Sequence, residues 1–152
     1  MIGVVEGAVT KTTAGSAASV ICAIQPAALS STVGMPELRE IGIFNVSGAA
    51  AEIGLIWGGT AGTTPSGQVT MVNSQNGGAG NTQVIPTYAT YPTTPGAYTW
   101  RAELQAVAGA GIIWTWLPGE WQLWGGASNY PCVVYQISAV TCVYDVYAKC
   151  AE

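Results

Sequence analysis

Hydrophobic and polar residues alternate along most of this chain in short runs, which end at clusters of Gly, Pro, Ser, Thr and Asn. A period of two over four to eight residues is typical of a β-strand with one buried face. No window keeps the spacing of an amphipathic helix over more than two turns. The pattern predicts strands at Ile2–Glu6, Ser19–Ile24, Leu38–Val46, Glu52–Trp57, Gln68–Val72, Thr82–Tyr88, Ala97–Leu104, Gly111–Trp116, Glu120–Leu123, Cys132–Ser138 and Val140–Lys149.

This many short strands in 152 residues predicts two packed sheets. We expect an all-β, antiparallel, jelly-roll-like β-sandwich, and a seven-strand immunoglobulin-like sandwich fits less well. Residues 1–31 are expected to form an extended N-terminal arm with the first strands, and residues 32–152 the sandwich, in one domain overall. The turn residues Leu117-Pro118-Gly119 predict a hairpin between Gly111–Trp116 and Glu120–Trp124.

Two long segments, which are expected to extend away from the sandwich, carry no charge at all. Gly58–Gly80 is rich in Gly, Thr, Ser and Asn, and Thr87–Pro95 is a loop of Tyr, Thr and Pro. Tyrosine offers a wide amphipathic contact area at low entropic cost. These loops are therefore candidates for intermolecular contact, and a simply exposed loop is the alternative.

The composition is apolar for a globular chain. Hydrophobic residues make up 49% of the sequence and charged residues 8%, against a usual share of about 25% charged. These proportions exclude intrinsic disorder, which needs few apolar and many charged residues. The longest largely apolar stretch, Ala106–Leu117, falls short of the ~20 residues of a membrane-spanning helix. We therefore predict no membrane partner and assign the surplus apolar surface to protein–protein contact.

The number and types of titratable residues argue against catalysis. The chain has no histidine, which excludes Ser-His-Asp and Cys-His nucleophiles and histidine-ligated metal sites. Four Lys and Arg residues are too few to neutralise a phosphate backbone, so we predict no nucleic-acid partner. No two carboxylates share a motif of the kind a glycosidase needs. We predict a non-enzymatic protein with no catalytic residue, no cofactor and no metal.

The four cysteines, Cys22, Cys132, Cys142 and Cys150, have no Cys-x-x-Cys spacing. A zinc site would need all four thiolates without that spacing. Cys142 lies in the last predicted strand and Cys150 directly after it, so a continuous strand would hold them too far apart to bond to each other. We expect small buried hydrophobic side chains in a reducing compartment.

Tryptophan is concentrated in one short segment of the chain. Trp114 and Trp116 have the same strand parity and should project from one face, whereas Trp121 and Trp124 differ in parity. Their apolar neighbours favour a core or a subunit interface over a sugar-stacking strip. The candidate interface residues are Trp114, Trp116, Trp121, Trp124, Tyr88, Tyr91 and Tyr98.

Two segments resemble a known class of proteins. "LREIGIFNVSGAAAEIGLIW" (Leu38–Trp57) is similar to the opening of small structural proteins of tailed-bacteriophage virions. Gly111–Glu152 is similar to their close, with a Trp-bearing strand, a Pro-Gly turn, a strand, and a last strand containing Tyr-Asp-Val-Tyr. The shared pattern runs from about Leu38 to Lys149 and consists of hydrophobic spacing and turns.

The resemblance implies a head decoration (cement) protein or related capsid accessory protein, which is a homo-oligomer and not an enzyme. Its partner would be the major capsid protein, its place the capsid surface of the virion, and its assembly site the host cytoplasm. Contacts would come from Met1–Ser31, Gly58–Gly80 and Thr87–Pro95, and a trimer is expected by analogy. The alternative is a head-fibre or tail receptor-binding domain or a carbohydrate-binding module.

Overall fold

The computed structural model describes residues 4–13, 19–26, 35–57, 62–92, 100–121, 123 and 131–152. All regular secondary structure in these ranges is β, and they contain no helix that could cross a lipid bilayer. The strands are β1 (Val4–Thr12), β2 (Ser19–Pro26), β3 (Glu37–Gly48), β4 (Ala51–Trp57), β5 (Thr63–Ser66), β6 (Val69–Asn73), β7 (Ala79–Ile85), β8 (Thr87–Thr90), β9 (Trp100–Leu104), β10 (Gly111–Thr115), β11 (Cys132–Gln136) and β12 (Cys142–Ala151).

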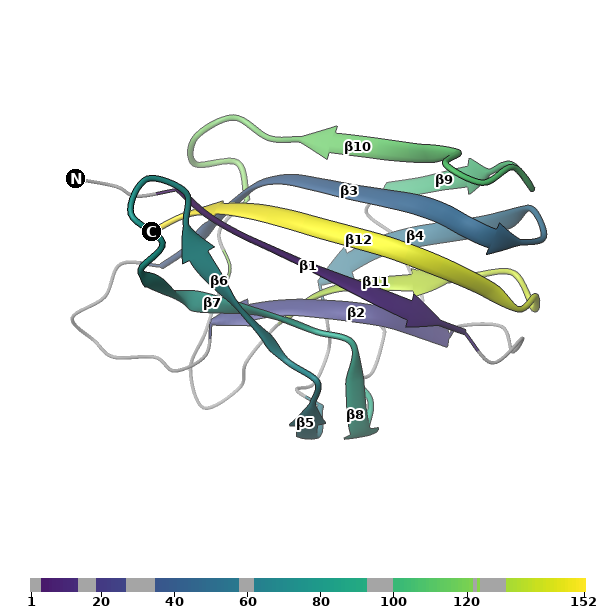
Figure 1. Cartoon of the computed structure of the whole chain (residues 1–152), viewed down its shortest axis with the longest axis horizontal. Helices are drawn as coiled ribbons and strands as arrows, with labels where there is room; N and C mark the ends of the chain where they lie inside the picture. The colour runs from purple at the N-terminus through teal and green to yellow at the C-terminus, as the bar shows by residue number, and fades with distance from the viewer. Residues whose placement is uncertain are drawn as a thin grey trace.

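Ten of these strands form one continuous antiparallel sheet in the order β10-β3-β12-β1-β6-β7-β2-β11-β4-β9 (Figure 1). The sheet folds over at the β6–β7 hairpin into two layers. Layer A is β10-β3-β12-β1-β6 and layer B is β7-β2-β11-β4-β9. The edge strands β9 and β10 come back into contact, so the sandwich is nearly a closed barrel. The predicted all-β antiparallel sandwich is thus confirmed.

Successive strands change layer repeatedly along the chain. β1 and β2, β3 and β4, β9 and β10, and β11 and β12 each place one strand in each layer, and β10-β3-β12-β1 in layer A matches β9-β4-β11-β2 in layer B. This wrapping is the jelly-roll-like arrangement expected from the sequence. The buried Asn45 holds one corner, because its Nδ2 donates to Ala49 O at 3.1 Å and Gln105 O at 3.0 Å.

The described part of residues 1–31 belongs to the sandwich itself. β1 pairs with β12 from Val4↔Ala151 to Thr12↔Val143, and β2 lies between β7 and β11. The expected first strands are therefore present, as inner strands of the two layers and not as an arm extending away from them. Two nonlocal pairings on each strand fix this position.

Three local details differ from the predicted pattern. β5, at Thr63–Ser66 in the uncharged Gly58–Gly80 segment, is a strand that the pattern does not predict. Pro86, which has no N–H to donate, divides the expected Thr82–Tyr88 strand into β7 and β8. The Leu117 turn forms, with Glu120 N donating to Leu117 O at 3.1 Å, but Leu38 N then bonds to Trp121 O. After the turn the chain therefore continues beside β3 instead of pairing back on β10, and the hairpin prediction is wrong.

The main core lies between the two layers, and a buried polar network closes one end of it. Gln136 is fully buried; its Oε1 accepts from Thr13 Oγ1 and Tyr144 OH, each at 2.8 Å. Its Nε2 donates to Ser138 O and Val140 O. Every polar atom of this amide is thus paired, as a buried amide requires.

All four cysteines are buried and free, as predicted. Burial raises the pKa of Cys22 to about 12 and raises the pKa values of Cys132 and Cys150 as well. Because the thiolate is the reactive form, these thiols act as apolar core groups.

Candidate functional site

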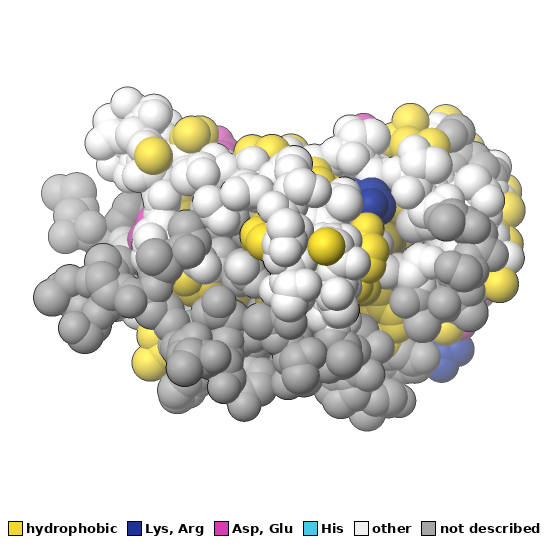
Figure 2. All heavy atoms as spheres, turned by 90° about the horizontal axis from the view of Figure 1, so that it is seen from below, with side chains coloured by type: hydrophobic (Ala, Val, Ile, Leu, Met, Phe, Trp, Pro, Cys, Tyr) yellow, Lys and Arg dark blue, Asp and Glu magenta, His cyan; other side chains and the backbone are white. Residues whose placement is uncertain are grey.

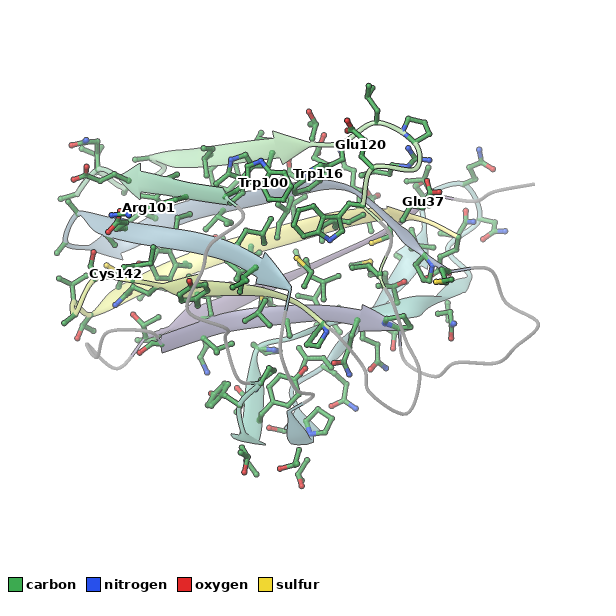
Figure 3. All side chains as sticks on the ribbon, turned by 180° about the vertical axis from the view of Figure 1, so that it is seen from behind. Glu37, Trp100, Arg101, Trp116, Glu120 and Cys142 are labelled. Carbon is green, nitrogen blue, oxygen red and sulfur yellow. The ribbon has the colours of Figure 1, made fainter. Side chains whose placement is uncertain are left out.

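The tryptophans lie at the seam where β9 and β10 approach each other. Trp100, Trp116 and Trp121 form one cluster with ring centroids 4.3 to 5.5 Å apart. Trp116 is 9% exposed and Trp121 is 3% exposed. Figure 3 shows Trp100 and Trp116 side by side at this opening. The cluster fills the gap that an incompletely closed barrel leaves, so it belongs to the core.

For Trp116 and Trp121 this placement fits the core alternative of the prediction. Trp114 does share a face with Trp116, but that face points inward, and Trp114 packs half-buried against the core. Tyr88 is also buried, at 4% exposure, and of the described candidates Tyr91 is the most exposed, at 36%. Trp124 and Tyr98 lie outside the described residues. The large rings that the sequence favours for intermolecular contact are mostly used inside the fold.

The outer face of layer B is covered. A second hydrophobic cluster lies there. In β11 the residues that face the core and the residues that face outward are all buried. Tyr88 reaches into this cluster from β8, which pairs with β5 in a separate two-stranded ribbon. The cluster consists of Val20, Ala23, Ile56, Ile85, Tyr88, Val133 and Tyr135.

The outer face of layer A is bare by comparison, and we call it the open face. Burial alternates along β12 and β1, so every second side chain points outward. Four large hydrophobic residues on outward positions are well exposed: Val4 (41%), Val46 (39%), Val72 (45%) and Ile113 (51%). On β10, β3, β12 and β1 the outward positions include Ile113, Thr115, Glu40, Gly42, Phe44, Val46, Val143, Asp145, Tyr147, Lys149, Val4, Glu6, Ala8, Thr10 and Thr12.

Two aromatic rings lie flat on the open face over glycines. A Cβ atom on Gly42 would overlap the ring of Tyr147, and one on Gly111 would overlap the ring of Phe44. The Phe44 and Tyr147 rings are nearly parallel, at 17°, with centroids 6.2 Å apart. The glycines thus allow the rings to cover the sheet instead of standing up from it.

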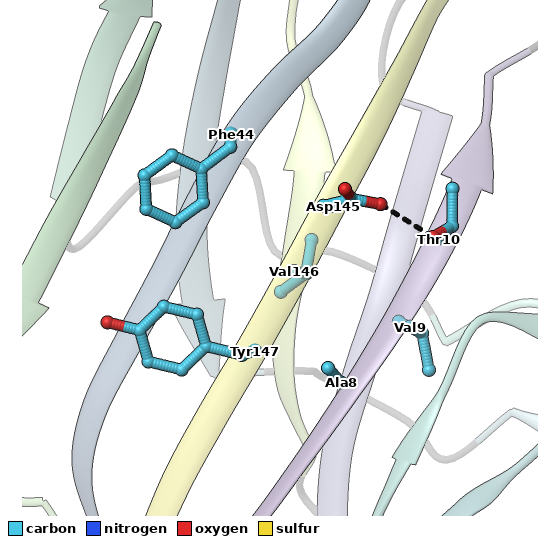
Figure 4. A pocket seen from close by; sticks show the side chains of 7 residues that line it. All are labelled: Ala8, Val9, Thr10, Phe44, Asp145, Val146 and Tyr147. Atoms are coloured by element: carbon cyan, nitrogen blue, oxygen red, sulfur yellow. Dashed lines mark hydrogen bonds between the residues drawn. The ribbon is translucent and has the colours of Figure 1, made fainter. Parts of the chain in front are cut away.

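A shallow hollow opens beside these rings (Figure 4). It has a volume of about 340 Å³ and runs from Phe44 and Tyr147 to the small side chains of Ala8 and Thr10 on β1. A neighbouring hollow of about 320 Å³ continues past Ala8 to Glu6. Asp145 in the first hollow accepts a hydrogen bond from Thr10 Oγ1 at 2.5 Å.

One end of the open face carries a fixed group of charges. Lys149 Nζ and Tyr147 OH both lie 2.8 Å from Glu40 Oε1, and Lys149 sits 5.6 Å from the centre of the Tyr147 ring. These bonds lower the pKa of Glu40, and the bond from Lys149 has the largest effect. The pKa of Lys149 is raised by the bond to Glu40. Burial and the bond to Glu40 raise the pKa of Tyr147.

The remaining acids offer no evident reaction centre. Glu37 pairs with Arg39 at 2.6 Å, and Glu52 pairs with Arg101. In the described ranges no three His, Cys, Asp or Glu side chains converge as metal ligands would. The prediction of a non-enzymatic protein stays a prediction.

The sequence analysis missed Phe44, Tyr147 and Ile113 as surface residues. The available signal was the two glycines Gly42 and Gly111 inside strand patterns, since a strand glycine marks a close approach by another group.

A scan against models of known protein families finds no match, and no curated protein matches the sequence significantly.

Proposed function

We propose that this chain is a non-enzymatic structural protein of a tailed-bacteriophage virion, a decoration (cement) protein that binds the major capsid protein on the assembled head. The observation that carries the proposal is a firmly held, uncharged polar platform on the side of layer B. This platform is the β5–β8 ribbon, Thr63–Ser66 with Thr87–Thr90.

The platform is exposed and free of charge. All four residues of β5 are exposed, as are Ala89 and Thr90 on β8. On the side of the molecule where the ribbon lies, the described atoms are mostly white with small yellow patches and few blue or magenta ones (Figure 2). Uncharged polar groups lose less on leaving water than charges do, so such a surface suits permanent contact.

The platform is also fixed to the sandwich. Lys11 of β1 donates from Nζ to Thr87 Oγ1 at 3.2 Å and to Tyr91 OH at 3.1 Å, and lies 5.5 Å from the Tyr91 ring centre. Tyr88 is buried beneath the ribbon. A surface that is already ordered loses little entropy on binding.

Such a protein would stabilise the head by linkage. A ligand that binds only one state of a shell stabilises that state by RT ln(1 + [L]/Kd), about 2.7 kcal/mol per site at a hundred times Kd. Summed over many sites, this resists expansion and rupture without any catalytic step.

Co-sedimentation with assembled, undecorated phage heads tests the proposal. We expect saturating, stoichiometric binding that raises the melting temperature of the head. Ser66→Lys places a charge on the platform and should weaken binding at least ~10-fold, since an unpaired buried charge costs more than 1.4 kcal/mol. Ala108→Lys, at an exposed residue of the turn after β9, is the matched control and should bind normally.

A chain that ignores heads but is retained on polysaccharide would overturn the proposal in favour of the carbohydrate-binding alternative. That alternative has weaker support, because no tryptophan is among the exposed large hydrophobic residues of the described chain.

A further inference from the structure

We infer that the open face of layer A binds the open face of a second copy of this chain. This inference goes beyond the proposed function, since it concerns the purified chain without any phage head. It rests on the shape, the charge pattern and the size of that face.

The open face has a bump and a hollow on one row of residues. Strand pairing aligns Ile113 of β10 with Gly42 of β3, Gly42 with Tyr147 of β12, and Tyr147 with Ala8 of β1. Ile113 is 51% exposed at one end of this row, whereas the hollows lie at the other end, around Ala8. The flat Tyr147 ring forms the floor between them.

Two copies can therefore fill each other's hollows. When two open faces meet with aligned strands, about a two-fold axis along the strands, β10 of one copy lies over β1 of the other. Each Ile113 then sits above the hollow at the other copy's Ala8.

The charges on the neighbouring row fit the same arrangement. Pairing aligns Glu40 of β3, Lys149 of β12 and Glu6 of β1. The two-fold axis that brings Ile113 over Ala8 also brings Glu40 of one copy over Lys149 of the other. By the same symmetry, Lys149 of the first copy lies over Glu40 of the second. Opposite charges thus meet across the contact, where a shifted register would place Glu40 against Glu6.

The face is large enough for a stable contact. The four strands that this two-fold overlays, β10, β3, β12 and β1, have 5 to 12 residues each. With strands ~4.8 Å apart and a rise of ~3.4 Å per residue, they cover at most roughly 600 Å². A standard interface buries about 800 Å² per partner, so the open face supplies most of one.

Sedimentation velocity of the purified chain, without phage heads, tests the inference. We expect a dimer, which Ile113→Glu should convert to a monomer by weakening association about 100-fold or more. Leu117→Glu is the matched control, because Leu117 is 70% exposed but lies in the turn after β10, away from this face. It should leave the mass unchanged.

Cross-linking tests the register independently of any loss of association. Ile113→Cys and Ala8→Cys chains, mixed and treated with a short bismaleimide, should give a mixed covalent dimer, whereas Leu117→Cys mixed with Ala8→Cys should not. The native thiols are buried and should not compete. The inference would be overturned if the wild-type chain were a monomer at ~100 μM, which is a hundred times a Kd of about 1 μM. It would also be overturned if the chain formed oligomers that Ile113→Glu did not weaken and that the bismaleimide did not cross-link. Head binding through the β5–β8 platform would stand in either case.

Discussion

Two tyrosines, one outside each layer of the sandwich, are packed in the same way yet end in different surroundings. Tyr88 lies against Gly62 and Tyr147 lies against Gly42, each so close that a Cβ on the glycine would overlap the ring. Tyr88 is 4% exposed, at the centre of a second hydrophobic cluster. Tyr147 is only half-buried, on a face that no described strand covers.

The difference comes from the rest of the chain and not from the tyrosines. On the outer side of layer B, Tyr88 of the β5–β8 ribbon packs into the second cluster, and all residues of β11 are buried. In layer A the central strand β12 keeps its alternation of buried and outward residues. Layer B thus buries a wholly hydrophobic outer cluster, whereas the open face of layer A exposes apolar side chains among charged and polar ones.

Truncating the two tyrosines should give the largest contrast. Tyr88→Ala removes a buried ring and should lower the free energy of unfolding by about 3–5 kcal/mol. Tyr147→Ala should cost about 1 kcal/mol, because its ring already meets water on one side. Urea unfolding of the monomeric chain, at low protein concentration, measures both losses. Equal losses would show that the open face is covered within the monomer.

The two glycines should differ in the same direction by smaller amounts. Gly62→Ala pushes against a ring that has no room to move and should cost about 1–3 kcal/mol. Gly42→Ala should cost under about 1 kcal/mol in the monomer, because the Tyr147 ring can swing outward. Since 1 kcal/mol shifts the melting temperature of a domain this size by about 2–4 °C, thermal unfolding separates them.

Two lysines, each placed over a tyrosine ring, give a finer comparison. Lys11→Met removes the link between β1 and the β5–β8 ribbon and should cost about 1 kcal/mol. Lys149→Met, on the open face, should cost less. Because Lys149 is solvent-exposed, its contribution should vanish at ~1 M salt. A salt-resistant loss for Lys149→Met in the monomer would contradict the description of this face as open.

The smallest effect concerns pH. The pKa of Glu40 is lower in the folded chain than its usual value of 4.5 because Lys149 and Tyr147 bond to it. A lowered carboxyl pKa adds stability above the unfolded-state pKa, which is lost as the pH falls through the folded-state pKa. Glu6, the other charge beside Lys149, stays in both proteins compared. The stability difference between wild type and Glu40→Gln should therefore shrink below about pH 4.5, as urea midpoints at pH 6 and pH 3 would show.

The strand pattern predicts most of the fold, because alternation survives wherever one side of a strand faces the core. It locates all the strands of the large sheet. It misses β5, whose four residues are all exposed and therefore show no alternation. It also predicts a strand after Gly119, where the chain instead bonds to the start of β3.

The site is harder to predict, because parity shows which residues share a face but not what covers that face. Trp114 and Trp116 share a face as predicted, but the opening between β9 and β10, which no local pattern encodes, draws Trp116 into the core. Tyr88 and Tyr147 each precede an alanine, and nothing in their flanking residues shows which ring will be covered. Only the nonlocal placement of β8 over layer B separates them.

The pairing of β1 with β12 gives the chain an unusual order of events during synthesis. β1 runs from Val4 to Thr12 and finds its longest partner only in Cys142–Ala151. At ~5–20 residues per second the ribosome releases that partner roughly 7–28 s after β1. For that time the first strand has an unpaired edge, and Glu6 and Lys11 within it are the charges that discourage pairing with another nascent chain. Replacing both with threonine should lower the soluble yield markedly, whereas the free energy of unfolding of the finished protein should change comparatively little.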